Sequence, residues 1–234
     1  MFDFTDRIVM VTGGSGSLGG VVVNAFAAAG ARLIIPDRAA DRVQSLFPEL
    51  AASQEHCLIP AADVTHPEGA EQVVSESMAH YGRIDILVNA LGGYKAGTPT
   101  HETSLDIWDS MMGLNARALF VVCRAVIPTM LTQQHGHIVN VAARAGLAGG
   151  ANMSAYSASK SAVIRLTETM AAEYRDAGIT VNAVLPGLID TPKAREEQPN
   201  ADYSRWVTPE ALAQIIMFLV SDAGKSITGA SIPA

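Results

Sequence analysis

The chain has 234 residues, of which 49% are hydrophobic and 17% are charged, a composition that suits one folded domain with a large core. Its 16 Lys and Arg residues against 23 Asp and Glu residues give a net charge of −7, with no basic patch. A general nucleic-acid or anionic-membrane binder is therefore not expected.

The cysteines and histidines do not predict a disulfide framework or a metal site. Cys57 and Cys123 are far apart, and His101, His135 and His137 lack metal-ligand spacing. The first residues lack the basic and apolar regions of a signal peptide, and no run of about 18 apolar residues occurs. We therefore expect a cytoplasmic protein without a membrane span.

Six short apolar runs predict β-strands, and a seventh run lies close to the C-terminus. Most of them are continuous rather than alternating, which is typical of parallel strands that helices cover on both faces. The expected strands are Arg7–Thr12, Arg32–Pro36, Cys57–Ala61, Ile84–Asn89, His137–Val141, Thr180–Leu185 and Ile227–Ile232.

Stretches with helical spacing separate these runs. The repeated alternation of strand and helix predicts a doubly wound α/β fold, a parallel sheet of about seven strands in one Rossmann domain over residues 1–234. Irregular stretches at 90–104 and 186–207 follow the fourth and sixth strands, so we expect them at the ligand-binding carboxyl edge of the sheet. The expected helices are Leu18–Ala29, Pro67–Tyr81, Leu105–Leu131, Ala155–Asp176 and Thr208–Asp222.

A glycine-rich turn, Thr12–Gly19, joins the first strand to the first helix. Its glycines allow a close backbone approach to a pyrophosphate, and the helix N-terminus presents free N–H groups to the anion. The second strand ends at Asp37, 24 residues after Gly13. An acid there accepts hydrogen bonds from ribose hydroxyls and repels a 2′-phosphate, so it favours NAD over NADP, whereas Arg38 can soften that preference.

Acidic side chains near this turn also have structural interpretations. Asp63 follows the third strand beside Val64, where it is placed to contact adenine or to act as a turn residue. Asp37 can instead cap the next helix. A glycine-rich turn without any ligand is a further alternative.

Tyr156 and Lys160 lie four residues apart early in a predicted helix, so they share one face. The ammonium is expected to lower the pKa of the phenol from about 10, which makes Tyr156 a usable proton donor or acceptor. Such pairs are common, and alone they do not predict an active site.

Taken in order, the motifs resemble those of the short-chain dehydrogenases/reductases over nearly the whole chain. The resemblance implies that Tyr156 is the general acid/base, that Lys160 lowers its pKa and holds the nicotinamide ribose, and that Asn115 fixes a water in a proton relay. The matching stretches are Thr12–Gly19, Asp63-Val64, Asn89–Gly92, Asn115, Gly136–Val141, Tyr156–Lys160 and Pro186-Gly187 with Ile189 and Thr191.

Together, the turn, the strand ends and the resemblance define a set of expected NAD contacts. Ile189 and Thr191 are expected on the carboxamide side of the nicotinamide. The full set is Gly13, Ser15, Gly16, Ser17, Leu18, Gly19, Asp37, Arg38, Asp63, Val64, Asn89, Ala90, Tyr156, Lys160, Pro186, Gly187, Ile189 and Thr191.

Two positions depart from the family pattern. Ser17 stands where a glycine is usual, and Ala143 stands thirteen residues before Tyr156, where the catalytic serine is usual. Loss of that hydroxyl donor costs an ordinary ketone reductase about 10²-fold or more in rate. Ser154 can replace it or can cap the helix start.

The missing serine is also a feature of the quinonoid dihydropteridine reductases, which this chain resembles in its Gly13–Gly19 turn, its Gly92–Gly97 segment and its short Leu188–Trp206 segment. That likeness implies an NADH-preferring enzyme for a quinonoid dihydropterin. Asn115 and the sequence Tyr-Ser-Ala-Ser-Lys are closer to 3-oxoacyl carrier-protein reductases, which implies a keto-reductase or alcohol dehydrogenase instead. A non-catalytic NAD-binding protein is the third alternative.

The candidate substrate-contact residues are Tyr94, Ala143, Arg144, Tyr203 and Trp206. The three aromatic rings can form walls for a flat ligand, and Trp206 can instead anchor its loop. The apolar helices at 105–131 and 155–176 resemble the paired helices of family dimers, which implies a homodimer or a homotetramer.

Overall fold

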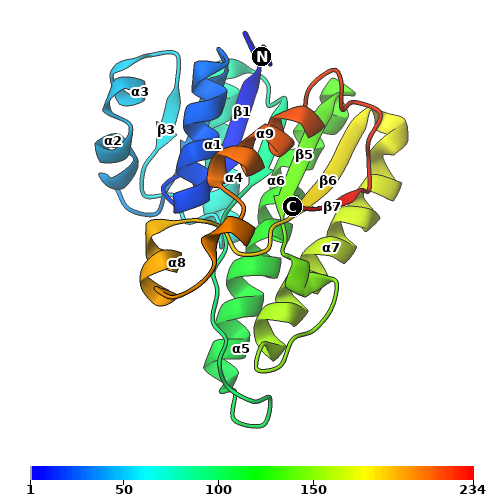
Figure 1. Cartoon of the computed structure of the whole chain (residues 1–234). Helices are drawn as coiled ribbons and strands as arrows, with labels where there is room; N and C mark the ends of the chain where they lie inside the picture. Colours follow the sequence, from blue (N-terminus) through cyan, green and yellow to red (C-terminus); the bar gives the residue numbers. More distant parts are fainter. Residues whose placement is uncertain (1) are drawn as a thin grey trace.

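Seven strands form one parallel sheet in the order β3-β2-β1-β4-β5-β6-β7 in the computed structural model, which describes residues 2–234 (Figure 1). The predicted doubly wound fold is therefore confirmed. The strands are β1 (Ile8–Thr12), β2 (Arg32–Pro36), β3 (Cys57–Ile59), β4 (Ile86–Asn89), β5 (Gly136–Val141), β6 (Ile179–Leu185) and β7 (Ser231–Pro233).

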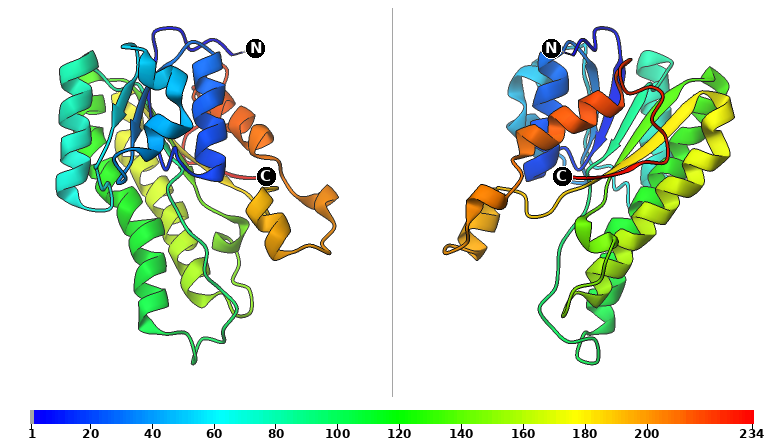
Figure 2. Two further views of the ribbon diagram at one scale, coloured as in Figure 1. Left: turned by 90° about the vertical axis from the view of Figure 1, so that its left-hand side faces the viewer. Right: turned by 45° about the vertical axis from the view of Figure 1, so that its right-hand side comes forward.

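Helices cover both faces of the sheet. Helices α4, α6 and α7 lie on one face, and α1 and α9 lie on the other (Figure 2). The helices are α1 (Ser17–Ala28), α2 (Arg42–Leu46), α3 (Pro48–Ala52), α4 (Pro67–Tyr81), α5 (Leu105–Met111), α6 (Ala118–Gln133), α7 (Ser154–Tyr174), α8 (Pro192–Glu197) and α9 (Pro209–Leu219), with a π-helical segment at Met112–Arg117 and 3-10 turns at Arg144–Gly146, Arg175–Ala177 and Tyr203–Arg205.

Neighbouring residues of the central strands pack on opposite faces, because side chains alternate along a strand. Met10 and Leu87 join the core beneath α4, α6 and α7. Val11 and Val88, one residue further along the same strands, join the core beneath α1 and α9. Both faces are thus buried, which explains why the strand sequences are continuously apolar.

The order of the strands indicates where a ligand-binding site lies on the sheet. Strands β1 and β4 are neighbours at the centre of the sheet. From β1 the chain adds β2 and β3 on one side, and from β4 it adds β5, β6 and β7 on the other. A sheet of this kind opens a crevice at the carboxyl ends of the two strands where the winding reverses. The glycine-rich turn after β1 and the loop after β4 meet there.

The long helix expected at Leu105–Leu131 is confirmed as a continuous helical stretch, Leu105–Gln133, but its interior contains a segment that was not predicted. The π-helical segment Met112–Arg117 separates α5 from α6. Apolar spacing does not signal such a segment, which is frequent at functional sites. By length and composition, Leu105–Gln133 is the one described helical stretch that could cross a membrane, but 56% of its apolar window is buried in this fold.

The seventh strand lies later than expected. Residues 227–230 lead into β7, which spans Ser231–Pro233. Gly229 has a φ of 74°, a left-handed conformation that interrupts an extended strand. The short helices α2, α3 and α8 were not expected, because five or six residues are too few for a periodic pattern.

Candidate active site

The turn between β1 and α1 has a shape that only glycine allows at two positions. Gly13 has a φ of +69°, and a Cβ atom on it would lie 2.7 Å from Leu91 N. A Cβ atom on Gly19 would overlap Gly13 O and lie 2.7 Å from Gly13 C. The backbone of the turn therefore approaches the loop after β4 very closely.

The N-terminus of α1 is open to an anion. Gly16 is the N-cap residue, no side chain caps the helix, and its first turn carries no acidic residue. The unpaired N–H groups of such a terminus attract a phosphate. Ser17 is the first helical residue and is exposed, so its side chain does not fill the turn.

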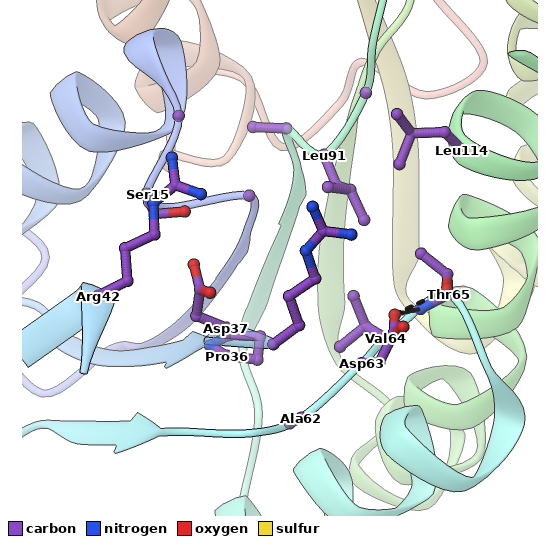
Figure 3. A pocket seen from close by; sticks show the side chains of 15 residues that line it. Ser15, Pro36, Asp37, Arg42, Ala62, Asp63, Val64, Thr65, Leu91 and Leu114 are labelled. Atoms are coloured by element: carbon purple, nitrogen blue, oxygen red, sulfur yellow. Dashed lines mark hydrogen bonds between the residues drawn. The ribbon is translucent and has the colours of Figure 1, made fainter. Parts of the chain in front are cut away.

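A pocket of about 270 Å³ extends from this turn across the ends of β2, β3 and β4 (Figure 3). The glycine-rich turn lines one part of the pocket mainly with backbone, whereas the residues after β2 line another part with the charged side chains of Asp37, Arg38 and Arg42. The lining residues are Gly13, Ser15, Gly16, Pro36, Asp37, Arg38, Arg42, Ala62, Asp63, Val64, Thr65, Ala90, Leu91, Gly92 and Leu114.

Asp37 lines this pocket at the end of β2 and is mostly buried. One carboxylate oxygen accepts a hydrogen bond from Ala39 N at 2.8 Å. Helix α2 begins only at Arg42, with Asp41 as its N-cap, so Asp37 does not cap that helix. Arg42 itself points toward the turn that carries Ser15 (Figure 3). The sequence interpretation missed Arg42, because it lies on a helix too short to be predicted.

Asp63 is both a turn residue and a pocket residue. Its carboxylate accepts hydrogen bonds from Thr65 N at 3.0 Å and Thr65 Oγ1 at 2.7 Å. The hydrogen bond from the Thr65 side chain is the main reason that the pKa of Asp63 lies below its ordinary value. The two interpretations of Asp63 are therefore compatible.

Asn89 does not line the pocket with its side chain. Its amide nitrogen donates to Asn140 Oδ1 at 2.9 Å and to Cys123 Sγ at 3.3 Å inside the sheet. These bonds hold β4 to β5 and α6, and the expected contact of Asn89 with NAD stays a prediction. Ala90, the next residue, does line the pocket.

These residues fit an adenine dinucleotide. The turn and the start of α1 suit a pyrophosphate, and the space between Asp37 and the Asp63–Thr65 turn suits an adenosine. Gly92, which also lines the pocket, lies close to α7. A Cβ atom on Gly92 would lie 3.3 Å from Lys160 Nζ and 2.9 Å from Asn115 Oδ1.

Lys160 is buried, and its ammonium donates a hydrogen bond to Val141 O at 2.9 Å. Burial penalises the charged form and lowers the pKa of Lys160 to about 8. The ammonium is therefore mostly protonated at neutral pH and is held at the end of β5.

Tyr156 lies one turn earlier on α7 and is half-buried. Its ring meets the ring of Tyr94 edge-on, with centroids 4.8 Å apart. Burial, with a smaller contribution from Tyr94, raises the pKa of Tyr156 to about 12. The expected lowering by Lys160 is therefore corrected: desolvation of the phenolate dominates, and the ammonium is bonded to the backbone of β5.

Asn115, at the centre of the π-helical segment, is buried and binds two other segments. Its Oδ1 accepts from Gly93 N at 2.8 Å, and its Nδ2 donates to Ser159 Oγ at 2.9 Å. Ser159 Oγ in turn donates to Tyr156 O at 2.8 Å. The side chain of Asn115 thus joins the loop after β4 to α7. Its expected water contact stays a prediction.

Ala143 is buried at the end of β5, and its methyl group provides no hydrogen-bond donor. Ser154 is the first residue of α7, and Met153 is the N-cap, so Ser154 does not cap the helix. Arg144 begins the 3-10 turn that follows Ala143, and its N–H donates to Pro186 O at 3.0 Å.

The segment after β6 has its own internal contacts. Tyr203 and Trp206 stack edge-on with centroids 4.8 Å apart, and the Arg195 guanidinium lies 4.6 Å from the Tyr203 centroid. Thr191 Oγ1 accepts from Ala194 N at 3.2 Å and caps α8. Ile189 bridges to Val207 at the base of this segment. The aromatic pair therefore stabilises the segment, which projects beyond the sheet near α9 (Figure 2).

Across residues 2–234, no group of three or more His, Cys, Asp or Glu side chains is arranged to hold a metal ion. The loops do form a pocket beside the glycine-rich turn, and the Lys160 and Asn115 side chains lie next to Gly92 of its lining.

Comparison with known proteins gives one family. Residues 7–202 match the family model described as short chain dehydrogenase. The (2S)-[(R)-hydroxy(phenyl)methyl]succinyl-CoA dehydrogenase subunit of Thauera aromatica is 35% identical, over 96% of this chain and 93% of its own. The 3-oxoacyl-[acyl-carrier-protein] reductase of Thermotoga maritima is 34% identical, over 95% and 94%.

Solved structures agree with this family match. An NAD⁺-bound xylitol dehydrogenase has a TM-score of 0.89 at 26% identity and covers 98% of both chains. A levodione reductase has a TM-score of 0.87 at 28% identity, covering 98% of this chain and 96% of its own.

Proposed function

The chain belongs to the short-chain dehydrogenase family and is an NAD(P)-dependent oxidoreductase, and from that premise we propose that it reduces a carbonyl group of a small molecule, with Tyr156 as the proton donor. The observation that carries this proposal is the position of Lys160. Its buried ammonium lies beside Gly92, where the dinucleotide pocket ends, and Tyr156 is one helical turn away.

The protein side of the chemistry follows from these positions. NADH held in this pocket would be the source of the hydride for the carbonyl carbon. Tyr156 has a pKa of about 12, so its phenol keeps its proton at neutral pH and gives it to the carbonyl oxygen. Lys160, with its lower pKa, holds the ribose, and Asn115 fixes the distance between the loop after β4 and α7 through Gly93 and Ser159.

A ketone or an oxoacyl compound is the substrate class that the relatives favour. A quinonoid dihydropterin is a second candidate, and the buried methyl of Ala143 favours it. Such a ring system accepts hydride readily, so it has less need of a hydroxyl donor. The family match supports an enzyme over a non-catalytic NAD-binding protein.

Oxidation of NADH, with NADPH in parallel, against simple ketones, 3-oxoacyl thioesters and quinonoid dihydropterin tests the function. Turnover of ketones or thioesters is expected. Turnover of the pterin alone selects the second candidate. Tight NADH binding without turnover of any of these compounds contradicts the proposal.

We further propose that the enzyme prefers NADH, because the Asp37 carboxylate repels a 2′-phosphate. Replacing Asp37 with Ser removes that charge and leaves Arg38 and Arg42 in the same pocket. The ratio of kcat/KM for NADPH to that for NADH is expected to rise roughly 10- to 100-fold, about 1.4–2.7 kcal/mol.

Steady-state kinetics with both cofactors measure this change. Adding Arg42→Gln to Asp37→Ser is the matched control and is expected to remove most of the gain in NADPH. An unchanged ratio in Asp37→Ser means that Asp37 does not select the cofactor.

A homodimer is the proposed assembly. Trp108 and Phe120 are large apolar side chains that are 41% and 50% exposed on α5 and α6. Phe120 lines a surface groove together with Met112, Ala116 and Leu166 of α7. A second copy that covers this groove removes those side chains from water.

Sedimentation of the wild-type protein is expected to give the mass of two chains, or four, and sedimentation of Phe120→Glu is expected to give the mass of one. A monomeric wild-type chain contradicts the proposal.

A further inference from the structure

The Arg144 backbone is fixed at the carboxyl edge of the sheet. Its N–H donates to Pro186 O at 3.0 Å, and its carbonyl accepts from Leu147 N at 3.0 Å. Gly146 N donates to Ala143 O at 2.9 Å. One hydrogen bond therefore ties the turn to Pro186 at the end of β6, and the other two close the turn itself, so the backbone position of Arg144 is well defined.

The same turn is packed against the catalytic helix. A Cβ atom on Gly146 would lie 2.8 Å from Lys160 O, so no space separates the turn from α7. Lys160 Nζ is bonded to Val141 O, three residues before Arg144. The turn that carries Arg144 and the helix that carries Tyr156 and Lys160 therefore form one rigid unit.

The Arg144 side chain lies along the end of β6. A Cβ atom on Gly187 would be 3.7 Å from Arg144 Cδ, 3.8 Å from Arg144 Nε and 4.0 Å from Ala234 O. Gly187 follows Pro186 in the segment where the family resemblance places the nicotinamide. The arginine side chain thus extends over the part of the edge where a substrate must approach.

Arg144 has no carboxylate partner. Within residues 2–234, no carboxylate oxygen lies within 4 Å of its guanidinium, whereas Arg195 and Arg205 in the neighbouring segment pair with Asp190 and Asp202 at 2.6 and 3.7 Å. A guanidinium presents five N–H donors in a planar fork that fits a carboxylate or a phosphate. Arg144 is free to bind one.

Exposed apolar side chains lie on the loops at the same edge of the sheet. Leu147 is 55% exposed, Leu188 is 47% exposed and Tyr94 is 60% exposed. They follow β5, β6 and β4 respectively. A cation among exposed apolar side chains suits a ligand that has an anionic group and an apolar body.

We propose that Arg144 binds an anionic group of the substrate, a carboxylate or a phosphate-type oxyanion, so that the enzyme selects oxo acids over neutral ketones. The inference rests on the proposed carbonyl reduction and names its substrate class. Arg144 adjoins Ala143, where the family serine is missing. Anchoring the anion orients the neighbouring carbonyl toward Tyr156 without a serine hydroxyl.

Pairs of an acid and its neutral ester test this selection. The pairs are 2-oxo-4-phenylbutanoate and its ethyl ester, benzoylacetate and its ethyl ester, and 2-oxopropylphosphonate and its dimethyl ester. The wild-type enzyme is expected to give a kcat/KM at least about 10-fold higher for the acid of one or more pairs. The pair that responds distinguishes a carboxylate from a phosphate-type group.

Arg144→Gln is expected to lower kcat/KM for that acid by about 10- to 100-fold and to leave the ester within about twofold. Arg144→Lys is expected to restore part of the loss, because it keeps the charge but not the fork. Arg175→Gln, which removes the same charge at the far end of α7, is the control and is expected to change neither substrate. An equal loss for acid and ester, or a wild-type preference for the esters, overturns the inference.

Equilibrium binding separates this inference from the proposed function. Titration of the NAD⁺-bound protein with the same acids, followed by intrinsic fluorescence, measures binding without turnover, because NAD⁺ carries no hydride to transfer. Acid binding by the wild type that Arg144→Gln abolishes supports the role of Arg144 even if no carbonyl is reduced, and that result contradicts the proposed reaction. Ketone reduction without acid binding retains the proposed reaction and overturns the inference.

Discussion

Replacing Tyr156 with Phe is expected to lower kcat by roughly 10²- to 10⁴-fold, the usual contribution of a positioned proton donor. The phenylalanine ring keeps the edge-on contact with Tyr94 and removes only the hydroxyl. In the described part of the chain, that hydroxyl makes no hydrogen bond to another group. The free energy of unfolding is therefore expected to change by less than about 1 kcal/mol.

Single-turnover oxidation of NADH measures the chemical step, and fluorescence titration measures NADH affinity, which is expected to stay within about twofold. Tyr174→Phe, the same chemical change at the last residue of α7, is the control and is expected to keep full activity. If Tyr156→Phe retains most of the wild-type rate, another group donates the proton.

Replacing Gly19 with Ala is expected to have the second large effect, on both cofactor binding and stability. The added methyl group would overlap Gly13 O and lie 2.7 Å from Gly13 C and 3.0 Å from Gly14 Cα. All three atoms belong to the backbone, so the turn must open to accommodate the methyl group. Such overpacking costs roughly 1–3 kcal/mol or more, and the displaced amides no longer converge on a pyrophosphate.

Chemical denaturation and NADH titration measure these two effects, and NADH affinity is expected to fall by at least about 10-fold, or 1.4 kcal/mol. Gly20→Ala is the matched control on the neighbouring residue. Its methyl group would lie 3.5 Å from the nearest atom, Gly14 O, an ordinary contact, and alanine favours the helix by about 1 kcal/mol. Equal behaviour of the two variants contradicts the steric argument.

The hydrogen-bond partners of Asn115 could not be predicted from the sequence motifs. Asn115 and Gly93 are 22 residues apart, and Asn115 and Ser159 are 44 residues apart, yet hydrogen bonds join all three. The family resemblance predicted a functional role for Asn115. Its side-chain partners became apparent only when the loop after β4, the π-helical segment and α7 were seen together.

The pKa values of Tyr156 and Lys160 also could not be predicted from their spacing in the sequence. Tyr156 and Lys160 are four residues apart, and this spacing predicted a lowered pKa for the phenol. The surrounding core instead removes water from both groups, raising the pKa of Tyr156 to about 12 and lowering that of Lys160 to about 8. Desolvation depends on what packs around a group, which its own spacing does not encode.

The sequence alone was enough to predict the fold and the position of the glycine-rich turn. Continuous apolar runs, glycines at the turn and Asp37 at the end of β2 are local signals, because strand burial and backbone conformation depend on nearby residues. Four features became apparent only in the folded structure: the π-helical segment, the place of Arg42 in the pocket, the Tyr203–Trp206 stack and the position of Arg144 beside Gly187. These features depend on contacts between segments that are distant in the chain, and local residue patterns do not predict such contacts.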